Sequence, residues 1–488
     1  MPYLASLEKE GIPTILINFN EETCKVEHDS TIHGIPKLRH IVASRNSVGG
    51  VSEAEILIQP VLDALIRPLT DEEQKGGLWA PHEPRILFEG TLPEAEEFYN
   101  QTEKIPGMLN APFARYTDGL PVVIPTEERV ETMLKGTSHK PDELITLQRD
   151  MEMPGFGVVE STMIRKKGDV IRFMPMYRTA TVEQVAVNAV MAGCKQEMFP
   201  VVLAIAESGG GTGDGRGAGG AFIISGPIYK EIGMNVTNSI FGPGNPAAKA
   251  IGRVGSILWR NLGGYKETVT TITTLGNPIV NGGFVIAEYD EGLPKGWKGL
   301  NEELGYRKDE SIVMPHPGGL IGEWGIGQQN APGVYRSLQR TGHGAIARFL
   351  DVKGIPGPHN YLEYLTKGAW ATRDGGFTLV MPPQVAQDLC DYGFKTKQEV
   401  YEWIWKRSFE PVSEFRMRGM QDFITNGWLG IEKTSGKPWK ELPNDYMVPA
   451  GGDNPFDSYN ILLCNMEETA VARFGGGHGP AYSIDAWR

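Results

Sequence analysis

Two acidic residues stand two positions apart at the end of an apolar run that is typical of a strand, Phe284-Val-Ile-Ala-Glu-Tyr-Asp290. Alternate side chains of a strand point to the same face, so the sequence predicts that Glu288 and Asp290 lie side by side. Paired carboxylates at the carboxyl end of a strand can transfer protons or hold a cation. A strand end in solvent would give the same pattern, and this alternative stays open.

Three histidines lie in stretches rich in glycine and proline: His316, His359 and His478. No two histidines are spaced i, i+4 on a predicted helix, so the sequence contains no local metal-binding motif, and we assign no residue as a metal ligand. Loops do carry functional groups when a rigid scaffold holds them. We therefore take Glu288, Asp290 and His316 as candidates for acid–base catalysis, and the sequence identifies no cofactor.

A glycine turn, Gly242-Pro-Gly-Asn-Pro246, leads directly into the strongest predicted helix of the chain. Backbone N–H groups at a helix N-terminus bind carboxylate or phosphate groups, and Arg253 lies two turns further on, off the apolar face. We predict that Gly242, Gly244, Asn245 and Arg253 bind an anionic substrate. Ordinary helix capping explains the Asn-Pro pair equally well.

Cys194 lies at the C-terminal end of a predicted helix, where the helix dipole disfavours a thiolate, so a buried structural cysteine is one interpretation. A catalytic role stays open because the N-terminus of the next helix follows at once.

A glycine-rich segment runs from Gly209 to Gly220. A dinucleotide-binding fingerprint lies between a strand and a helix, whereas these glycines precede a strand, so we predict a mobile loop instead.

The candidate residues are positioned by a central stretch, Thr181 to Gly264, in which capping residues, prolines and glycines mark where the predicted elements begin and end. Thr181 and Gln184 form a capping box before an apolar helix that ends at Gly193. Three further elements follow from their apolar patterns: an apolar run at 200–206, a buried strand at 221–225, and a helix that begins at Asn245-Pro246 and ends at Gly263.

More elements are predicted on either side of this stretch, from periodicity and caps. Those before it are strands at 14–18 and 39–43, a helix capped by Ser52 with Glu55, a helix from about Pro93 to Asn100, and one from Thr126 through Leu134. Those after it are strands at 377–381 and 459–464, a helix that starts at Pro382-Pro383, and one capped by Thr396 with Glu399. Residues 292–375 are predicted to be irregular.

These elements predict an α/β protein with mostly parallel sheet elements, because strands alternate with helices. We divide the chain into a small N-terminal α/β piece (1–70), a connecting segment with helices (71–140), a central α/β core (141–300) and a C-terminal α/β lobe (301–488). The N-terminal piece is too short to bury a core by itself, so we expect it to pack against another polypeptide.

The composition limits the classes of partner. The 488 residues carry 47 basic and 60 acidic side chains, a net charge of −13, which argues against nucleic acid and anionic membranes as partners. No apolar run approaches the ~18 residues of a membrane span, and the first residues do not form a signal peptide. The cysteines (Cys24, Cys194, Cys390, Cys464) form no C-x-x-C pair, which favours a reduced, cytoplasmic protein.

Three segments carry a resemblance to a known family: Tyr116 to Val130, Ala186 to Cys194 with Pro200, and Phe241 to Arg253. They resemble large bacterial proteins that are found alongside, or fused to, small thiol proteins named for a UGSC motif, a selenocysteine or cysteine followed by Gly-Ser-Cys. Residues 7–65 resemble the later half of that small domain. No Cys-Gly-Ser-Cys occurs here, and the half that carries it would lie before Met1, so the resemblance implies a thiol motif on a separate chain.

The resemblance also implies thiol- or metal-assisted metabolism, with cleavage or reduction of a carbon–heteroatom bond as the expected reaction. We expect an enzyme, or the large subunit of a hetero-oligomeric enzyme, that acts on a small anionic metabolite. The alternative is a non-catalytic subunit that positions a separate thiol-bearing chain. In either case the expected partner is a second protein chain or another copy of this one.

Overall fold

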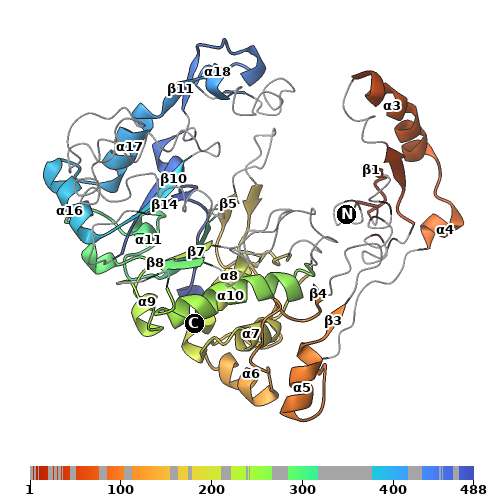
Figure 1. Cartoon of the computed structure of the whole chain (residues 1–488), viewed down its shortest axis with the longest axis horizontal. Coiled ribbons are helices and arrows are strands. Elements are labelled where there is room, and N and C mark those ends of the chain that lie inside the picture. The colour runs from red at the N-terminus through yellow and green to blue at the C-terminus, as the bar shows by residue number, and fades with distance from the viewer. Residues whose placement is uncertain are drawn as a thin grey trace.

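Figure 1 presents a computed structural model of the whole chain. The residues that the structure describes are 10–19, 37–43, 51–75, 85–103, 113–153, 163–173, 178–209, 221–237, 242–265, 284–316, 376–415, 431–449 without 433, 454–464 and 472–488, with single positions 4, 7, 8, 23, 26, 30, 35, 240 and 452.

A four-stranded mixed sheet forms the centre of the protein. Its strands, in spatial order, are β15 (Tyr482–Ser483), β9 (Ile312–His316), β7 (Ala221–Ser225) and β8 (Phe284–Ala287). β7 and β8 are parallel, whereas β9 runs antiparallel to β7 and to β15. Every residue of β7 and β9 is buried, which explains why their sequences are largely apolar rather than alternating.

A three-stranded sheet has the order β13 (Tyr459–Leu463), β10 (Phe377–Met381), β14 (Ala472–Gly475). β10 is parallel to β13 and antiparallel to β14. β13 is an edge strand, and two of its outward backbone groups have partners outside the sheet. The Ile461 N–H donates to the hydroxyl of Tyr401, and the Leu463 carbonyl accepts from the Tyr289 N–H. These bonds cover an edge that would otherwise expose unpaired backbone groups.

The two sheets pack face to face, and helices cover both outer faces. The layer between the sheets contains Ile223, Ile286 and Met314 from the four-stranded sheet and Val380 and Leu462 from the other. α7 (Val182–Met191), α8 (Phe199–Glu207) and α10 (Pro246–Asn261) cover the four-stranded sheet, and α16 (Pro383–Tyr392) and α17 (Lys397–Arg407) cover the three-stranded one. Figure 1 shows the resulting α–β–β–α order from α10 through β7 and β10 to α17.

The predicted caps form at three helix starts. Capping boxes of Thr181 with Gln184 and of Thr396 with Glu399 precede α7 and α17. Thr126 accepts from the backbone of Arg129 in front of α6 (Glu127–Leu134). These bonds satisfy backbone donors that a helix start leaves without partners, so the local sequence fixes where each helix begins.

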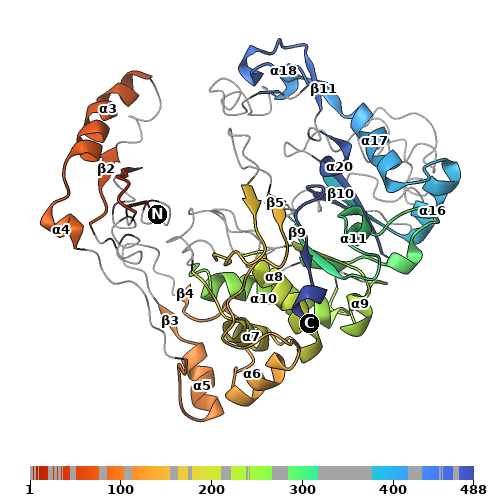
Figure 2. The ribbon, with the colours of Figure 1, turned by 180° about the vertical axis from the view of Figure 1, so that it is seen from behind.

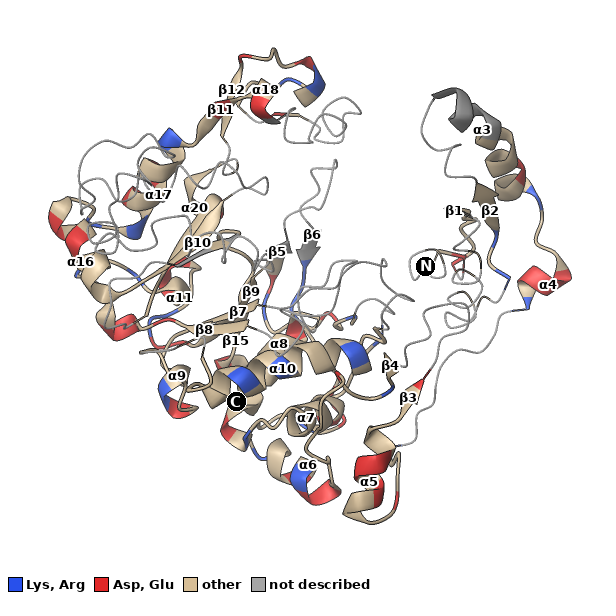
Figure 3. Ribbon diagram, viewed as in Figure 1, with Lys and Arg blue, Asp and Glu red and all other residues tan. Residues whose placement is uncertain are grey.

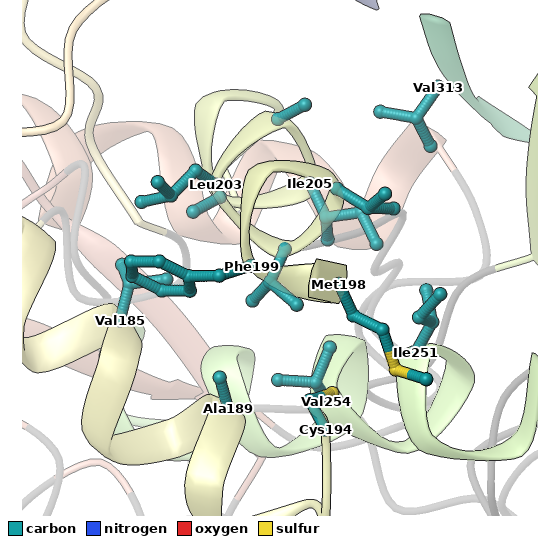
Figure 4. Packing of buried hydrophobic residues seen from close by; sticks show 14 of the residues in the cluster. Val185, Ala189, Cys194, Met198, Phe199, Leu203, Ile205, Ile251, Val254 and Val313 are labelled. Atoms are coloured by element: carbon teal, nitrogen blue, oxygen red, sulfur yellow. The ribbon is translucent and has the colours of Figure 1, made fainter. Parts of the chain in front are cut away.

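α8 is the most enclosed of the helices that cover the four-stranded sheet, because each of its residues is buried. Figure 4 shows Phe199 of α8 beside Val185 of α7, with Ile251 and Val254 of α10 nearby. A helix that is apolar on all sides is typical of a buried position, which accounts for the continuous apolar run that the sequence shows here.

The N-terminal piece has two parallel strands, β1 (Leu16–Phe19) and β2 (His40–Ala43), followed by α3 (Val51–Ile66) and α4 (Asp71–Gln74). The predicted cap formed by Ser52 with Glu55 lies outside the residues whose side chains the structure describes. Figure 3 shows acidic residues on α4 and on α5 (Leu92–Tyr99), in keeping with the negative net charge.

The remaining elements are short. Antiparallel pairs are β3 (Thr102–Glu103) with β4 (Phe113–Ala114), β5 (Met151–Met153) with β6 (Met163–Arg165), and β11 (Phe409–Pro411) with β12 (Met447–Pro449). The other α-helices in the described residues are α9 (Ile228–Glu231), α11 (Leu300–Glu303), α18 (Val412–Phe415) and α20 (Pro455–Ser458). The 3₁₀ turns are η3 (Gln196–Met198), η5 (Asp290–Gly292), η8 (Trp439–Glu441) and η9 (Asp485–Trp487).

The C-terminus lies beside α9 and α10 in both views of the ribbon (Figures 1 and 2). Arg488 holds it there with an ion pair of 2.8 Å to Glu231 at the end of α9. The final residues therefore belong to the central part of the fold.

The α/β class predicted from the sequence is confirmed, with parallel and mixed sheets. Residues 292–375 are not irregular throughout, because α11 and β9 lie within them. Of the predicted loop at 209–220, residues 210–220 lie outside the described residues. Within the described part of the chain, no helix has the length and apolar character needed to cross a membrane.

Candidate functional site

Glu288 follows the last residue of β8 and is fully buried. Its Oε2 accepts from the Ser225 hydroxyl at 2.8 Å and from the Leu300 backbone N–H at 2.7 Å. Its Oε1 accepts from Lys397 Nζ at 2.9 Å. A buried carboxylate needs such donors, because removing an unpaired charge from water is very costly.

Lys397 is the first residue of α17, and its side chain is 1% exposed. Its Nζ lies 3.2 Å from Oε2 of Glu303, the last residue of α11, in addition to its contact with Glu288. Burial alone would lower the pKa of Lys397, but the two carboxylates outweigh burial and raise it. The ammonium group is therefore charged at neutral pH and joins the two carboxylates.

Glu303 has two further neighbours. Its Oε1 lies 3.2 Å from the hydroxyl of Tyr401, and its Oε2 lies 3.8 Å from Nε2 of His478. Burial opposes ionisation of Glu303, yet the charge of Lys397 outweighs burial and, with the neighbouring His478, holds the pKa of Glu303 below its ordinary value. Burial, and next the charge of Glu303, raise the pKa of Tyr401 well above its ordinary value, so this hydroxyl stays protonated and can donate.

The ring of His478 is held in one orientation. Its Nδ1 lies 2.6 Å from the carbonyl oxygen of Phe456, and the two rings stack with centroids 4.2 Å apart. A carbonyl oxygen only accepts hydrogen bonds, so Nδ1 carries the proton and Nε2 of the neutral ring is an acceptor. The basic nitrogen of His478 thus faces Glu303.

Glu288, Glu303, Lys397, Tyr401 and His478 form what we call the ionisable cluster. Two carboxylates and one ammonium leave a net charge of −1 when His478 is neutral, and protonation of His478 balances it. In this arrangement Nε2 of His478 faces Oε2 of Glu303 at 3.8 Å, which is the geometry of an acid–base pair.

The predicted pairing of Glu288 with Asp290 is wrong. β8 ends at Ala287, and Asp290 is the first residue of the 3₁₀ turn η5. Glu288 and Asp290 are therefore not part of one strand, and the strand geometry that would point both side chains to the same face does not apply. Asp290 instead accepts from the hydroxyl of Tyr229 at 3.2 Å. The chain leaves the sheet immediately after Ala287, and the period of two that the prediction needs does not reach Asp290.

His316 is the last residue of β9 and not part of a loop, which corrects the sequence-based placement. Its Nε2 lies 2.9 Å from the hydroxyl of Thr378 and 2.9 Å from the carbonyl oxygen of Gly476. Burial lowers the pKa of His316 to about 4, so the ring is neutral at physiological pH. His316 thus lies in the layer between the sheets and outside the ionisable cluster.

Cys194 lies in the core beneath the four-stranded sheet, close to Val254 in Figure 4. Burial raises the pKa of its thiol to about 12, and burial also raises the pKa of Cys464. A thiol of this kind is protonated at neutral pH and is a poor nucleophile. The position of Cys194 therefore gives no support to a catalytic role.

Asn245 precedes α10 as predicted, but its side chain does not cap the helix. The side-chain oxygen accepts from the Asn235 N–H, and Nδ2 donates to the carbonyl oxygens of Asn235 and Ile240, so the residue closes the loop before the helix. Gly242 and Gly244 lie in the turn between Ile240 and Asn245. A Cβ added to Gly244 would meet no atom within 4 Å apart from its neighbours in the chain.

Arg253 is already paired within the chain. Its Nε and Nη2 donate to the two carboxylate oxygens of Asp118, each at 2.9 Å, and Nη2 also donates to the carbonyl oxygens of Leu120 and Pro121. Arg253 therefore ties α10 to the segment that precedes α6, and these bonds occupy the guanidinium that the sequence assigned to an anion.

The structure does not bring the predicted site residues together. Cys194, Asn245 and Arg253 belong to the helical layer on the outer face of the four-stranded sheet. Glu288 and His316 lie at its inner side, next to the second sheet. A sheet therefore separates the predicted anion-binding turn from the ionisable cluster.

Three members of the ionisable cluster were missed by sequence reasoning: Glu303, Lys397 and Tyr401. Lys397 carried a detectable signal, because a lysine at the first position of a helix opposes the positive end of the helix dipole. Such a residue needs a carboxylate nearby. Nothing in the local sequence indicates which carboxylate, since Glu288 and Glu303 come from segments about a hundred residues earlier.

In the described part of the chain, no group of three or more His, Cys, Asp or Glu side chains is placed to hold a metal ion. The chain matches no protein-family model, no curated protein and no solved structure. The class of the protein therefore rests on its α/β fold, and the candidate site rests on the ionisable cluster.

Proposed function

We propose that this chain is an enzyme, or the large subunit of one, that acts on a small metabolite, and that His478 and Glu303 move a proton in its reaction. The observation that supports this proposal is the ionisable cluster, in which Lys397 joins two carboxylates and the basic nitrogen of His478 faces one of them. A histidine beside a carboxylate is a common acid–base pair.

The burial of the cluster argues for a role beyond stability. The side chains of Glu288, Lys397 and His478 are at most 2% exposed, and that of Glu303 is 8% exposed. Apolar residues of similar volume at such positions are often as stabilising as a buried ion pair or more so. Buried groups with perturbed pKa values are enriched at functional sites, which favours a site that handles protons.

The anionic character of the substrate is a separate part of the proposal. This part rests on the sequence alone. The N-terminus of α10 carries no acidic residue in its first turn, but it belongs to the outer face of the four-stranded sheet and does not line the ionisable cluster. Cleavage or reduction of a carbon–heteroatom bond remains an expectation from the resemblance, and a thiol step would need a second chain.

The test is a screen for turnover, followed by variants of the cluster. The purified chain, alone and co-expressed with the products of neighbouring genes, is incubated with a panel of small carboxylates and phosphates, and their consumption is followed by mass spectrometry. For a substrate found in this way, E303Q should lower kcat by about 10²-fold or more, and H478Q should remove one limb of the pH–rate profile. E402Q, in the exposed pair with Lys406 on the same helix as Lys397, is the matched control.

Circular dichroism at the assay temperature shows whether each variant is folded. Loss of one pH limb in a folded H478Q protein would support proton transfer, because a purely structural residue would not shift the profile. Consumption of no compound by the chain or by its complexes would refute the enzyme proposal, as would unchanged kcat in E303Q.

A scaffolding role is the second candidate, and one observation favours it. The N-terminal piece exposes several large apolar side chains, which a partner could cover: Ile17, Val42, Ile58, Leu62 and Ile66. Light scattering after size-exclusion chromatography of the co-expressed proteins tests this role. A specific contact should bury more than ~1,000 Å² in total. A catalytically active monomer of 53.6 kDa would exclude it.

A further inference from the structure

Asn460, in the middle of the edge strand β13, is fully buried, with a relative exposure of 0%. Among the residues that the structure describes, neither Nδ2 nor Oδ1 of this side chain has a hydrogen-bond partner, although the backbone of the strand is paired. A carboxamide offers two donors and one acceptor oxygen, and leaving such groups unpaired in a core is destabilising. Buried polar groups of this kind almost always have a partner.

The side chain of Asn460 faces the layer between the two sheets. Asn460 is the register partner of Thr378, and Leu462 is that of Val380, so these four side chains share one face. Val380 and Leu462 belong to the apolar cluster of that layer, which places Asn460 there as well. Asn460 is therefore a polar group in a layer that is otherwise mostly apolar.

Two other polar side chains lie in the same part of the layer. The hydroxyl of Thr378 donates to the carbonyl oxygen of Gly476 at 2.8 Å, and His316 Nε2 lies 2.9 Å from both of these oxygens. A carbonyl oxygen can only accept, so Nε2 of His316 carries a proton. The bonds among these three groups leave the carboxamide of Asn460 outside their network.

The chemistry of these neighbours selects a neutral ligand. The pKa of His316 lies near 4, so its ring is uncharged at neutral pH, and threonine and asparagine carry no charge. Lys397 is engaged by Glu288 and Glu303. A single ligand atom that satisfies both ends of the carboxamide must accept from Nδ2 and donate to Oδ1, which is what a hydroxyl group does.

We infer that Asn460 binds a hydroxyl-type group in the layer between the two sheets, either an internal water molecule or the hydroxyl of a small neutral compound. The group accepts a hydrogen bond from Nδ2 and donates one to Oδ1, and the hydroxyl of Thr378, the register partner of Asn460, belongs to the same face. Internal waters typically make about three hydrogen bonds to groups that would otherwise be unsatisfied. The inference does not depend on the proposed enzymatic role.

A crystal structure of the purified protein at high resolution tests the inference. We expect non-protein electron density within hydrogen-bond distance of both Nδ2 and Oδ1 of Asn460. Mass spectrometry of the denatured protein distinguishes the two sources, because a retained organic compound would be released and water would not be detected. A carboxamide that contacts only protein atoms in that map would overturn the inference.

The variant N460V gives a second, independent measurement. Valine suits a buried strand and leaves no polar group behind. If the carboxamide of Asn460 has no hydrogen-bond partner in the wild-type protein, N460V should be more stable than the wild type. If the carboxamide holds a bound group, N460V loses those hydrogen bonds and should be less stable. We expect Tm to fall by about 2 °C or more. N301V is the matched control, because Asn301 is also buried and its Nδ2 donates to three protein carbonyl oxygens, so its Tm must fall in any case. A higher Tm for N460V than for the wild type would contradict the inference.

Discussion

Lys397 Nζ lies 2.9 Å from Glu288 Oε1, although 109 residues separate the two along the chain. The contact joins the first residue of α17, which covers the three-stranded sheet, to the residue that follows β8 of the four-stranded sheet. It is therefore a direct link between the two halves of the α–β–β–α arrangement.

Replacement of Lys397 by methionine should destabilise the protein strongly. K397M leaves Glu288 and Glu303 buried without their cation, and breaking a buried ion pair on one side typically costs about 3–5 kcal/mol. Urea unfolding followed by circular dichroism measures the loss. K406M is the control, because the pair of Lys406 with Glu402 is exposed and should contribute less than about 1 kcal/mol. Equal effects of the two substitutions would contradict the importance of the buried pair.

The stability of the protein should depend on the protonation of Glu207 at the end of α8. Its carboxylate accepts from the Gln148 N–H and from Trp487 Nε1, each at 2.7 Å, and burial raises its pKa from 4.5 to about 7. A carboxyl group with a raised pKa binds its proton more tightly in the folded state. Its contribution is complete below pH 4.5 and is lost as the pH rises towards 7.

Urea unfolding between pH 4.5 and 8 measures this dependence. The free energy of unfolding should fall by up to about 1.4 kcal/mol per pH unit up to pH 7 because of this group, and E207Q should remove that part of the slope. E402Q, which changes an exposed carboxylate, should keep the slope of the wild type. An E207Q protein with the same slope as the wild type would show that Glu207 does not titrate in this range.

Arg253 should contribute to stability through Asp118. The two side chains form a bidentate pair in which Arg253 is 17% and Asp118 11% exposed. R253A should lower the free energy of unfolding by about 1.5–3 kcal/mol, the range for hydrogen bonds to charged groups. A double-mutant cycle with D118A should be clearly non-additive, because both single changes remove the same interaction. Additive effects of R253A and D118A would mean that the two side chains do not stabilise each other, and the guanidinium of Arg253 would then be available for the predicted anion.

Gly376 should tolerate no side chain at the start of β10. Its φ is +82°, and a Cβ added there would lie 1.7 Å from the carbonyl oxygen of Ser458, a backbone atom that cannot rotate away. G376A should therefore lower Tm far more than G233A. Gly233 has a φ of +65° with nothing within 4 Å of the added Cβ, so only the backbone penalty remains there. Similar Tm values for the two variants would contradict the close approach of the strands.

The sequence alone determined the parts of the fold that depend on neighbours a few residues apart. Thr181 with Gln184 and Thr396 with Glu399 predicted where α7 and α17 begin, and the apolar run at 377–381 predicted β10. A capping box closes within four residues, and a buried strand shows in its own composition, so neither depends on the rest of the chain.

Only the tertiary structure decided which of these elements meet. β9 takes its place because it pairs antiparallel with β7, about ninety residues earlier, and no local pattern specifies that partner. Asn245 is a good capping residue by type, yet its side chain bonds to Asn235 and Ile240. Glu288 was visible as an acidic residue at a strand end, but its connection to His478 passes through Lys397 and Glu303. These contacts arise from the packing of the two sheets, which brings together segments whose separation in sequence carries no information about their distance in space.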